Sequence, residues 1–322
     1  MTAPPRVVAG RGAEHRAPLV VIDDFLPAKL AAAIRGDIDV HFAEPAVHRP
    51  DTHQVWNYRF VPQLYTYLRT APEKLIRRDR VDEFMRAMQS WSILTLGLGN
   101  VTWPYLSLYV AGCRQGLHND ATNGRFAFVY SLTRDARRTI GGETLVFRQG
   151  DPFRGNLAAA SAGRSFYEVI EPKFNRLVVF DDRLPHAVER VEGSMDPCEG
   201  RFVLHGHLSE TGPIISGALP LADIEEPMMA ALQRFAAQNT ARIALYRGPL
   251  TLRFIIRPGG SVETCEILLD RVLHEDPYHI EWEPLRADLI DVIRKLKFPP
   301  AGGETVVTKP LVFGAPLPAP RP

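Results

Sequence analysis

The chain has 322 residues, of which 38 are basic and 37 acidic, and its formal net charge is +1. This balance gives no electrostatic footprint for nucleic acid or for an anionic membrane, so neither is expected as a partner. Three scattered cysteines favour a reducing compartment. Because the N-terminus has no apolar leader and no long apolar run follows, we expect a cytoplasmic location.

The first hundred residues indicate a flexible start and a few mixed elements. Residues 1–17 are polar and rich in Pro and Arg, which predicts a flexible N-terminus. Residues 18–26 predict a short buried strand, 27–34 a helix, 43–62 an irregular loop, and 72–89 a second helix. We expect the two helices to flank the sheet that follows.

From residue 105 to residue 208, short β-rich runs recur between Gly, Asn and Asp residues. The predicted strands cover residues 106–110, 127–132, 144–147, 176–180, 187–191 and 201–208. Many short strands separated by turn signals are typical of an antiparallel sandwich or barrel.

The last third of the chain predicts a separate small α+β domain. Gly and Pro residues concentrate just before it, which places a linker at 211–228. The domain then covers 229–316, with helices at 229–242 and 284–296 and strands at 249–257, 261–269 and 304–313. Gly259 and Gly260 suit the tight turn between the first two strands. Residues 317–322 predict a Pro-rich tail.

The strongest candidate site combines His118, Asp120 and His186. Two side chains two positions apart on an extended chain point the same way, so His118 and Asp120 can face one metal ion. A distant histidine would complete a facial triad and leave three coordination positions open. Non-haem iron(II) uses this arrangement, because 2-oxoglutarate fills two positions and oxygen the third. Taken alone, His-x-Asp could equally be a surface turn without a metal.

A carboxylate co-substrate needs a cation, and the planar fork of arginine pairs with it best. Arg201, at the start of a predicted strand, is our candidate for this role, with Tyr109 as a second donor or a core residue. Arg190 is a competing candidate. In an extended strand, the side chains of Arg201, His205 and His207 share one face.

Several motifs together resemble the prolyl-4-hydroxylase-like branch of the iron(II)- and 2-oxoglutarate-dependent oxygenases. They are Leu108-Tyr109, Gly116-Leu117-His118-Asn119-Asp120, Gly141-Gly142-Glu143-Thr144-Leu145-Val146-Phe147, Phe180-Asp181-Asp182, Pro185-His186-Ala187-Val188 and Arg201. The ordered set is specific, although the spacing from His186 to Arg201 is longer than the family pattern. The resemblance covers residues 18–210.

The resemblance implies a double-stranded β-helix, or jelly roll, with flanking helices. It implies iron(II), 2-oxoglutarate and oxygen as the reacting partners of a dioxygenase. We expect hydroxylation of an unactivated C–H bond in an amino acid, a peptide or a peptide-derived natural product, with succinate and carbon dioxide as co-products. Two alternatives stay open: a jelly-roll binding or scaffold protein without turnover, and a cupin-type metal enzyme that also uses His205 and His207.

Other residues are weaker candidates. Arg125, Trp103 and His205 could line a substrate pocket, although packing or solvated roles are as plausible for them. Residues 229–316 resemble the C-terminal domain of TonB-like energy transducers, through the strand at 250–256, the Gly259-Gly260 turn and Leu296-Lys297-Phe298-Pro299. That family presents an edge strand to a partner, so this domain could contact a protein partner or a second subunit.

Overall fold

The computed structural model describes residues 6–8, 18–43, 55–134, 139–147, 166–274 and 282–314. By its internal contacts the chain divides into two compact units. The first unit comprises Met1–Gln89 and Val101–Leu208, and the second comprises Ser90–Asn100 and Ser209–Pro322.

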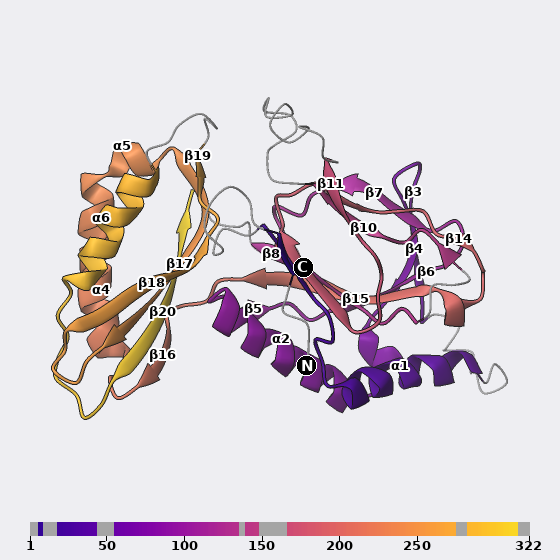
Figure 1. Ribbon diagram of the computed structural model, residues 1–322, viewed down its shortest axis with the longest axis horizontal. Helices are drawn as coiled ribbons and strands as arrows, with labels where there is room; N and C mark the ends of the chain where they lie inside the picture. The colour runs from indigo at the N-terminus through magenta and orange to yellow at the C-terminus, as the bar shows by residue number, and fades with distance from the viewer. Residues whose placement is uncertain are drawn as a thin grey trace. The chain divides into compact units, whose positions relative to one another are not determined.

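A curled antiparallel sheet makes up most of the first unit (Figure 1). Its main path within the described residues runs β1-β2-β12-β8-β15-β6-β4-β7-β13-β10-β11. These strands are β1 Arg6–Val8, β2 Leu19–Ile22, β4 Tyr65–Thr70, β6 Tyr105–Tyr109, β7 Arg114–His118, β8 Phe126–Ser131, β10 Thr144–Phe147, β11 Tyr167–Ile170, β12 Arg176–Asp181, β13 His186–Val188 and β15 Arg201–Ser209. Off this path, β3 (Asn57–Val61) pairs with β4 and β5 (Asn100–Val101) with β15, while β9 (Thr139–Ile140) and β14 (Glu192–Gly193) pair with each other. This mostly-β architecture is consistent with the jelly roll predicted from the sequence.

Two helices accompany the sheet of the first unit. Helix α1 (Ala28–Ala43) buries Ala31, Ile34 and Ile38, whose spacing marks one face of a helix. Helix α2 (Arg78–Thr95) follows the short 3-10 turn η4 (Pro72–Lys74). Its residue Phe84 is fully buried, with its ring 5.2 Å from that of Tyr130 on β8. The helices thus help to form the core beneath the sheet.

Arg35 on α1 fixes the segment that lengthens the spacing between His186 and Arg201. The side chain is fully buried and donates to the carbonyl oxygens of Leu132 and Cys198 at 2.9 and 2.6 Å. Cys198 belongs to η6 (Pro197–Glu199), whose first turn is capped by the carboxylate of Asp196. The extra residues therefore form an ordered turn that delivers the chain to the start of β15.

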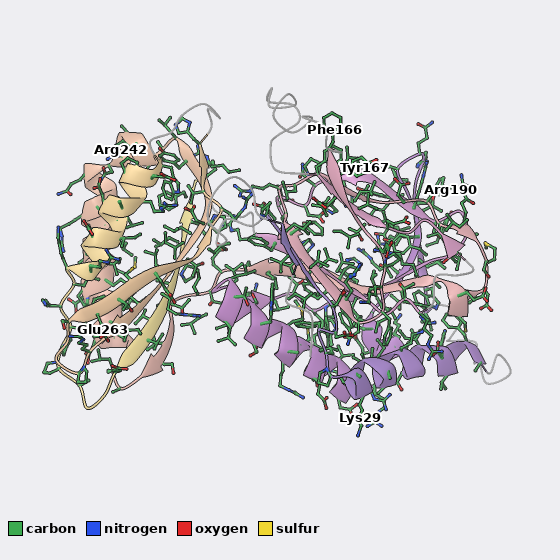
Figure 2. All side chains as sticks on the ribbon, in the orientation of Figure 1. Lys29, Phe166, Tyr167, Arg190, Arg242 and Glu263 are labelled. Atoms are coloured by element: carbon green, nitrogen blue, oxygen red, sulfur yellow. The ribbon has the colours of Figure 1, made fainter. Side chains whose placement is uncertain are left out.

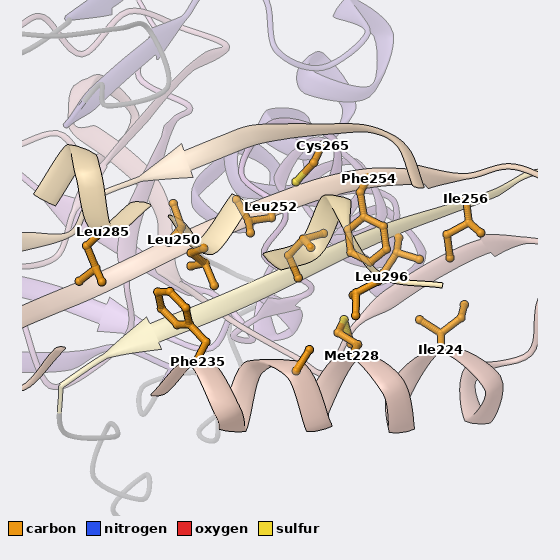
Figure 3. Packing of buried hydrophobic residues seen from close by; sticks show 14 of the residues in the cluster. Ile224, Met228, Phe235, Leu250, Leu252, Phe254, Ile256, Cys265, Leu285 and Leu296 are labelled. Carbon is orange, nitrogen blue, oxygen red and sulfur yellow. The ribbon is translucent and has the colours of Figure 1, made fainter. Parts of the chain in front are cut away.

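The second unit is an α+β structure. Its sheet runs β16-β20-β17-β18, with bounds Ile214–Gly217, Thr305–Phe313, Tyr246–Ile256 and Val262–Asp270, and β19 (Leu273–His274) also pairs with β17. Helices α4 (Leu221–Gln238), α5 (Thr240–Ile243) and α6 (Trp282–Arg294) complete it. Leu250, Leu252 and Phe254 alternate along β17 and pack against the apolar faces of the helices (Figure 3).

Several elements differ from those expected. Residues 57–61, expected in an irregular loop, form β3, and residues 44–54 of that loop lie outside the described residues. Within the expected linker 211–228 lie β16 and the first turns of α4, which continues through Pro227. Most of the predicted flexible N-terminus and the tail 317–322 also lie outside the described residues. None of the described helices is long and apolar enough to span a bilayer.

Candidate metal centre

His118 and His186 lie directly opposite each other on neighbouring antiparallel strands. His118 is the last residue of β7 and His186 the first of β13, and the two are register partners. Their ring centroids are 4.2 Å apart. The pairing of β7 with β13 therefore brings together two imidazoles that are 68 positions apart in the sequence.

Both imidazoles are held in the same tautomer by main-chain carbonyls. Nδ1 of His118 lies 2.8 Å from the carbonyl oxygen of Gly116, and Nδ1 of His186 lies 3.0 Å from that of Leu184. Because a carbonyl oxygen can only accept, each Nδ1 must carry the hydrogen. The lone pair of a neutral ring is then on Nε2, which is the arrangement found in histidines that bind metals.

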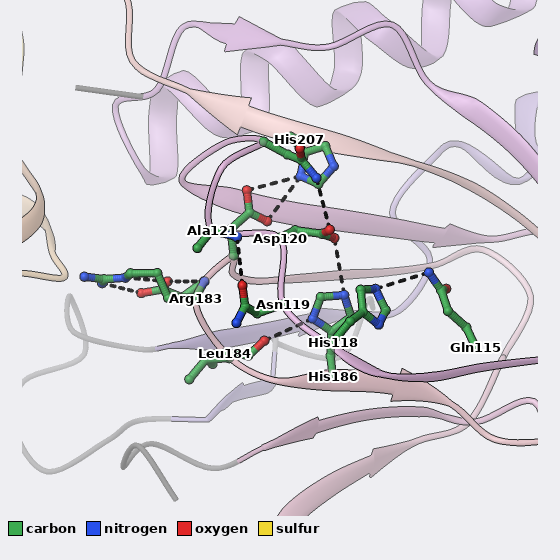
Figure 4. Close-up of polar contacts among 12 residues, drawn as sticks. Gln115, His118, Asn119, Asp120, Ala121, Arg183, Leu184, His186 and His207 are labelled. Carbon is green, nitrogen blue, oxygen red and sulfur yellow. Dashed lines mark hydrogen bonds and ion pairs between the residues drawn. The ribbon is translucent and has the colours of Figure 1, made fainter. Parts of the chain in front are cut away.

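Asp120 completes the cluster at the turn that follows β7. Its backbone N–H donates to the carbonyl oxygen of Asp182 at 2.9 Å, and its Oδ1 accepts from Asn123 at 3.0 Å. Its Oδ2 lies 3.4 Å from Nε2 of His186. One potential ligand atom from each of His118, Asp120 and His186 lies within 4.8 Å of the other two (Figure 4). This donor set, two neutral nitrogens and one carboxylate, fits a divalent transition metal.

Electrostatics favour the protonation states that a metal needs. Burial and the neighbouring His186 lower the pKa of His118, which keeps its ring neutral. Burial alone would raise the pKa of Asp120, but the positive charge that the neighbouring rings of His186, His207 and His118 carry when doubly protonated brings it down to about 2. The carboxylate is therefore ionised near neutral pH, and the neutral ring of His118 has its lone pair on Nε2.

Arg201 is a buried cation without a carboxylate partner among the described residues. Its side chain is 3% exposed, and Nη2 donates to the hydroxyl of Thr144 at 3.0 Å. The guanidinium also lies over the ring of Tyr109, 4.8 Å from its centroid. In the described part of the chain, Nε and Nη1 have no hydrogen-bond partner. Because a buried, unpaired charge is costly, these two donors call for an anionic ligand.

A cation–ring contact followed by two hydrogen bonds links this arginine to the metal cluster. The hydroxyl of Tyr109 donates to Oε1 of Gln115 at 3.1 Å, and Nε2 of Gln115 lies 3.1 Å from Nε2 of His118. The ring of Tyr67 stacks on Tyr109 at 5.2 Å, and burial raises the pKa of Tyr109 well above its usual range. Tyr109 therefore remains a neutral hydroxyl donor between the two parts of the site.

Asp182 and His207 form a second polar pair beside Asp120. Nδ1 of His207 lies 3.1 and 3.2 Å from the two carboxylate oxygens of Asp182 (Figure 4). Burial raises the pKa of Asp182 to about 6, against the opposing effect of His207. Burial also acts to lower the pKa of His207, but its hydrogen bond to Asp182 outweighs this and raises it.

The remaining sequence candidates lie in varied surroundings. Trp103 donates its indole N–H to Glu73 at 3.0 Å and packs under the guanidinium of Arg78, so its polar edge is not directed at the metal cluster. Arg125 contributes main-chain contacts, since its carbonyl oxygen accepts from the N–H of Asp182 and its own N–H donates to Leu208.

His205 and Arg190, also named from the sequence, differ in burial. Nε2 of His205 lies 2.8 Å from the hydroxyl of Ser107, and burial together with Arg69 lowers its pKa to about 3. Arg190 is 58% exposed, pairs with Glu192 at 2.8 Å, and lies at the periphery of the first unit (Figure 2). Of the two arginines considered, Arg201 is the one with buried, unsatisfied donors.

Sequence reasoning did not single out Gln115, Thr144 or Asp182 as site residues. Thr144 and Asp182 stand within or beside motifs that carried the resemblance, so proximity to those motifs was the only available signal. Gln115 lies three positions before His118, so regular alternation along a strand would place the two side chains on opposite faces; the register between β7 and β13 shifts between these positions. Its contact with Tyr109 depends on tertiary structure, and no local pattern indicates it.

Comparison with known proteins bears on the same segment. Residues 105–208 match the 2OG-Fe(II) oxygenase superfamily. The matched region starts at β6 and ends on β15, and it includes the three clustered residues and Arg201. The chain therefore contains a 2OG-Fe(II) oxygenase domain, and the prediction of an oxygenase-class enzyme is confirmed. This superfamily implies iron(II), 2-oxoglutarate and oxygen.

Solved structures with partial similarity are also known. A prolyl-4-hydroxylase from Pseudomonas putida is 19% identical, with 60% of this chain and 93% of that chain covered and a TM-score of 0.43. A prolyl hydroxylase from Trichoplax adhaerens, in complex with a peptide fragment of the hypoxia inducible factor oxygen degradation domain, is 14% identical, with 58% and 81% covered and a TM-score of 0.43. A 2OG-Fe(II) oxygenase family oxidoreductase from Burkholderia pseudomallei is 17% identical, with 58% and 83% covered and a TM-score of 0.38. No curated protein matches the chain in sequence.

Proposed function

We propose that the first unit is an iron(II)- and 2-oxoglutarate-dependent dioxygenase that hydroxylates an unactivated C–H bond. The proposed metal ligands are His118, Asp120 and His186, and the proposed anchor for the distal carboxylate of 2-oxoglutarate is Arg201. The substrate class is an amino acid, a peptide or a peptide-derived natural product. The co-products would be succinate and carbon dioxide.

The observation that carries this proposal is the pair of unsatisfied donors on Arg201. A metal cluster alone would suit many metal-binding proteins. A buried guanidinium with free Nε and Nη1, connected through Tyr109 and Gln115 to His118, additionally fits a carboxylate ligand beside the metal. Both requirements of an oxo-acid co-substrate are met within one cluster of side chains.

Each residue of the site has a defined task in this proposal. His118 and His186 offer Nε2 lone pairs, and Asp120 supplies the negative charge that partly neutralises a divalent ion. Arg201 and Thr144 would bind and orient the co-substrate, and the hydroxyl hydrogen of Tyr109 would turn from Gln115 to the same carboxylate. The chemistry supplied by the bound metal and co-substrate is oxidation of a C–H bond by dioxygen. The chain's own part is to fix the ligands, to exclude water from Arg201 and to hold the co-substrate in one pose.

Uncoupled turnover tests this function. Purified protein is mixed anaerobically with iron(II) and 2-oxoglutarate, oxygen is admitted, and succinate is measured for the wild type, His118→Ala and Asp120→Ala. Succinate from the wild type and little from the variants supports the proposal. If the wild type forms no succinate and shows no visible charge-transfer band with iron(II) and 2-oxoglutarate, the non-catalytic or cupin-type alternative replaces it.

For the second unit we propose a binding role through a sheet edge. The support is the order of its sheet, in which β16 and β18 have no second neighbour on the main path of described strands, and an edge strand can accept an added strand. Hydrogen exchange of the full chain at low and high protein concentration tests it with a second copy of the chain as the partner. Slower exchange in β16 or β18 at high concentration supports the role, and unchanged exchange in both contradicts it.

A further inference from the structure

The pair formed by Asp182 and His207 does not belong to the proposed ligand set, yet it lies against Asp120. Asp182 follows β12 and its side chain is 1% exposed, while His207 lies near the end of β15. One potential ligand atom from each of Asp120, Asp182 and His207 lies within 4.8 Å of the other two. Two carboxylates and an imidazole thus lie close together, and they share Asp120 with the proposed metal site.

The orientation of His207 is set from one side. Its Nδ1 faces both carboxylate oxygens of Asp182 at 3.1 and 3.2 Å, so the opposite edge of the ring is turned toward Asp120 (Figure 4). The backbone is held as well, because the N–H of His207 donates to the hydroxyl of Thr102 at 2.9 Å and its carbonyl accepts from the N–H of Thr102 at 3.0 Å. The ring therefore has little freedom to rotate away.

Asp182 and His207 are closely packed against Gly124. A Cβ atom built on Gly124 would lie 2.7 Å from Oδ2 of Asp182 and 2.7 Å from Cβ of His207. The carbonyl of Asp182 also accepts the N–H of Asp120 at 2.9 Å. Asp182 consequently contacts Asp120 by two routes, directly through the main chain and indirectly through His207.

We propose that Asp182 and His207 act as a positioning pair that fixes the carboxylate of Asp120 for metal binding. Asp182 orients His207, and His207 restrains the carboxylate so that Oδ2 stays on the side of His186. This inference rests on the proposed function. An alternative reading, a second metal ion held by Asp120, Asp182 and His207, is an outcome of the test below. It is disfavoured because Asp182 is fully buried and both its oxygens already face Nδ1 of His207.

Two amide substitutions of His207 test separately the contact made by Nδ1 and the contact made by Nε2. In His207→Asn the amide nitrogen takes the place of Nδ1 and can still reach Asp182, whereas in His207→Gln it takes the place of Nε2 and can reach Asp120. The measurement is the affinity and stoichiometry of cobalt(II) for the full chain without oxygen, together with the visible spectrum of bound cobalt. Loss of an outer-shell partner typically weakens metal binding by about 10- to 100-fold. We expect such a loss, with an altered cobalt spectrum, for His207→Asn and Asp182→Ala, a smaller loss for His207→Gln, and near-wild-type binding for Asp182→Asn.

The matched control is Ser107→Ala, which removes a buried polar partner of His205 from the same sheet without touching Asp120. It should leave cobalt affinity unchanged even if it lowers the melting temperature. Equal cobalt affinity in the wild type and all His207 variants would overturn the positioning role, as would equal losses in His207→Asn and His207→Gln. Two cobalt ions in the wild type and one in His207→Asn would replace the role with a second metal site.

The same titration separates this inference from the proposed function. If the wild type binds one ion and forms succinate while the His207 variants bind as tightly, only the positioning role fails. If the wild type binds no divalent metal, both proposals fail together.

Discussion

His118 and His186 face each other across one strand pair, with their ring centroids 4.2 Å apart and each Nδ1 engaged by a carbonyl two residues earlier in the chain. The separation is short enough for both Nε2 atoms to reach one ion, and too short for two imidazolium charges to coexist without strong repulsion. Burial and the neighbouring His186 accordingly lower the pKa of His118, which favours its neutral ring.

Replacing Arg201 by Met should abolish binding of 2-oxoglutarate without lowering the free energy of unfolding. The buried guanidinium has two unsatisfied donors, so an apolar side chain of similar length should leave the free energy of unfolding unchanged or raise it by about 1–4 kcal/mol. Binding of 2-oxoglutarate should be lost. Thermal denaturation with manganese(II), with and without 2-oxoglutarate, measures both effects. Arg190→Met, at the exposed competing position, should behave as the wild type, and a ligand-induced stabilisation that persisted in Arg201→Met would rule out this anchor.

Replacing Gln115 by Ala should strengthen metal binding. In the metal-free protein its amide engages Nε2 of His118, which is the atom that a metal would need. Removing one hydrogen bond of about 0.5–1.5 kcal/mol corresponds to an affinity gain of about 2- to 10-fold. Cobalt(II) titration measures it. Arg114→Ala serves as a control, since that side chain bonds the carbonyl of Gln63 instead. Weaker binding in Gln115→Ala would show that the amide supports the metal site.

His205 should make the protein less stable in mild acid. Burial and Arg69 lower its pKa to about 3, whereas in the unfolded chain it titrates near 6.5. Between these values the unfolded state binds the additional proton, so the free energy of unfolding falls as the pH drops below about 6.5. The expected loss from this residue is on the order of 1–2 kcal/mol at pH 5. Urea unfolding at several pH values should show a shallower pH dependence for His205→Gln, and identical slopes would contradict the assignment.

Gly260→Ala and Gly259→Ala are a matched pair of substitutions in the second unit. Gly260 has φ +82°, and a Cβ atom there would lie 1.9 Å from the carbonyl oxygen of Phe298, whereas nothing lies within 4 Å of a Cβ on Gly259. Gly260→Ala should therefore lower the free energy of unfolding by about 2 kcal/mol or more, through strain and the displaced contact. Gly259→Ala should change it by less than about 1 kcal/mol. Denaturant unfolding of both variants decides the matter, and equal stabilities would be evidence against the strain at Gly260.

Much of the strand pattern could be predicted from the sequence, because strand runs bounded by turn residues are local signals. The runs at 127–132, 144–147, 176–180 and 201–208 correspond closely to β8, β10, β12 and β15. The expected start of α4 was too late. A proline usually ends a helix, at a cost of about 3 kcal/mol, yet Ile224 and Met228 continue one buried face across Pro227. Burial of that face compensates the cost, and no local rule contains this compensation.

The candidate site was also predicted only in part. Residue type and order sufficed to nominate His118, Asp120 and His186, whose potential ligand atoms the structure brings together. The exposed strand β3 was not expected, because Tyr58 and Phe60 stack on each other in solvent instead of alternating between core and surface. The contacts of Gln115 and the burial of Asp182 depend on strands distant in sequence, so composition and spacing do not predict them.

The two carbonyl acceptors beneath His118 and His186 belong to the peptide backbone, and this affects how the site can change over time. A histidine oriented by a glutamate loses its orientation when that glutamate mutates. Here, a substitution at Leu184 removes no acceptor, because the oxygen is present whatever the side chain. The orientation of the two imidazoles thus depends on the backbone conformation alone. The surrounding side chains can change with the substrate without altering that orientation.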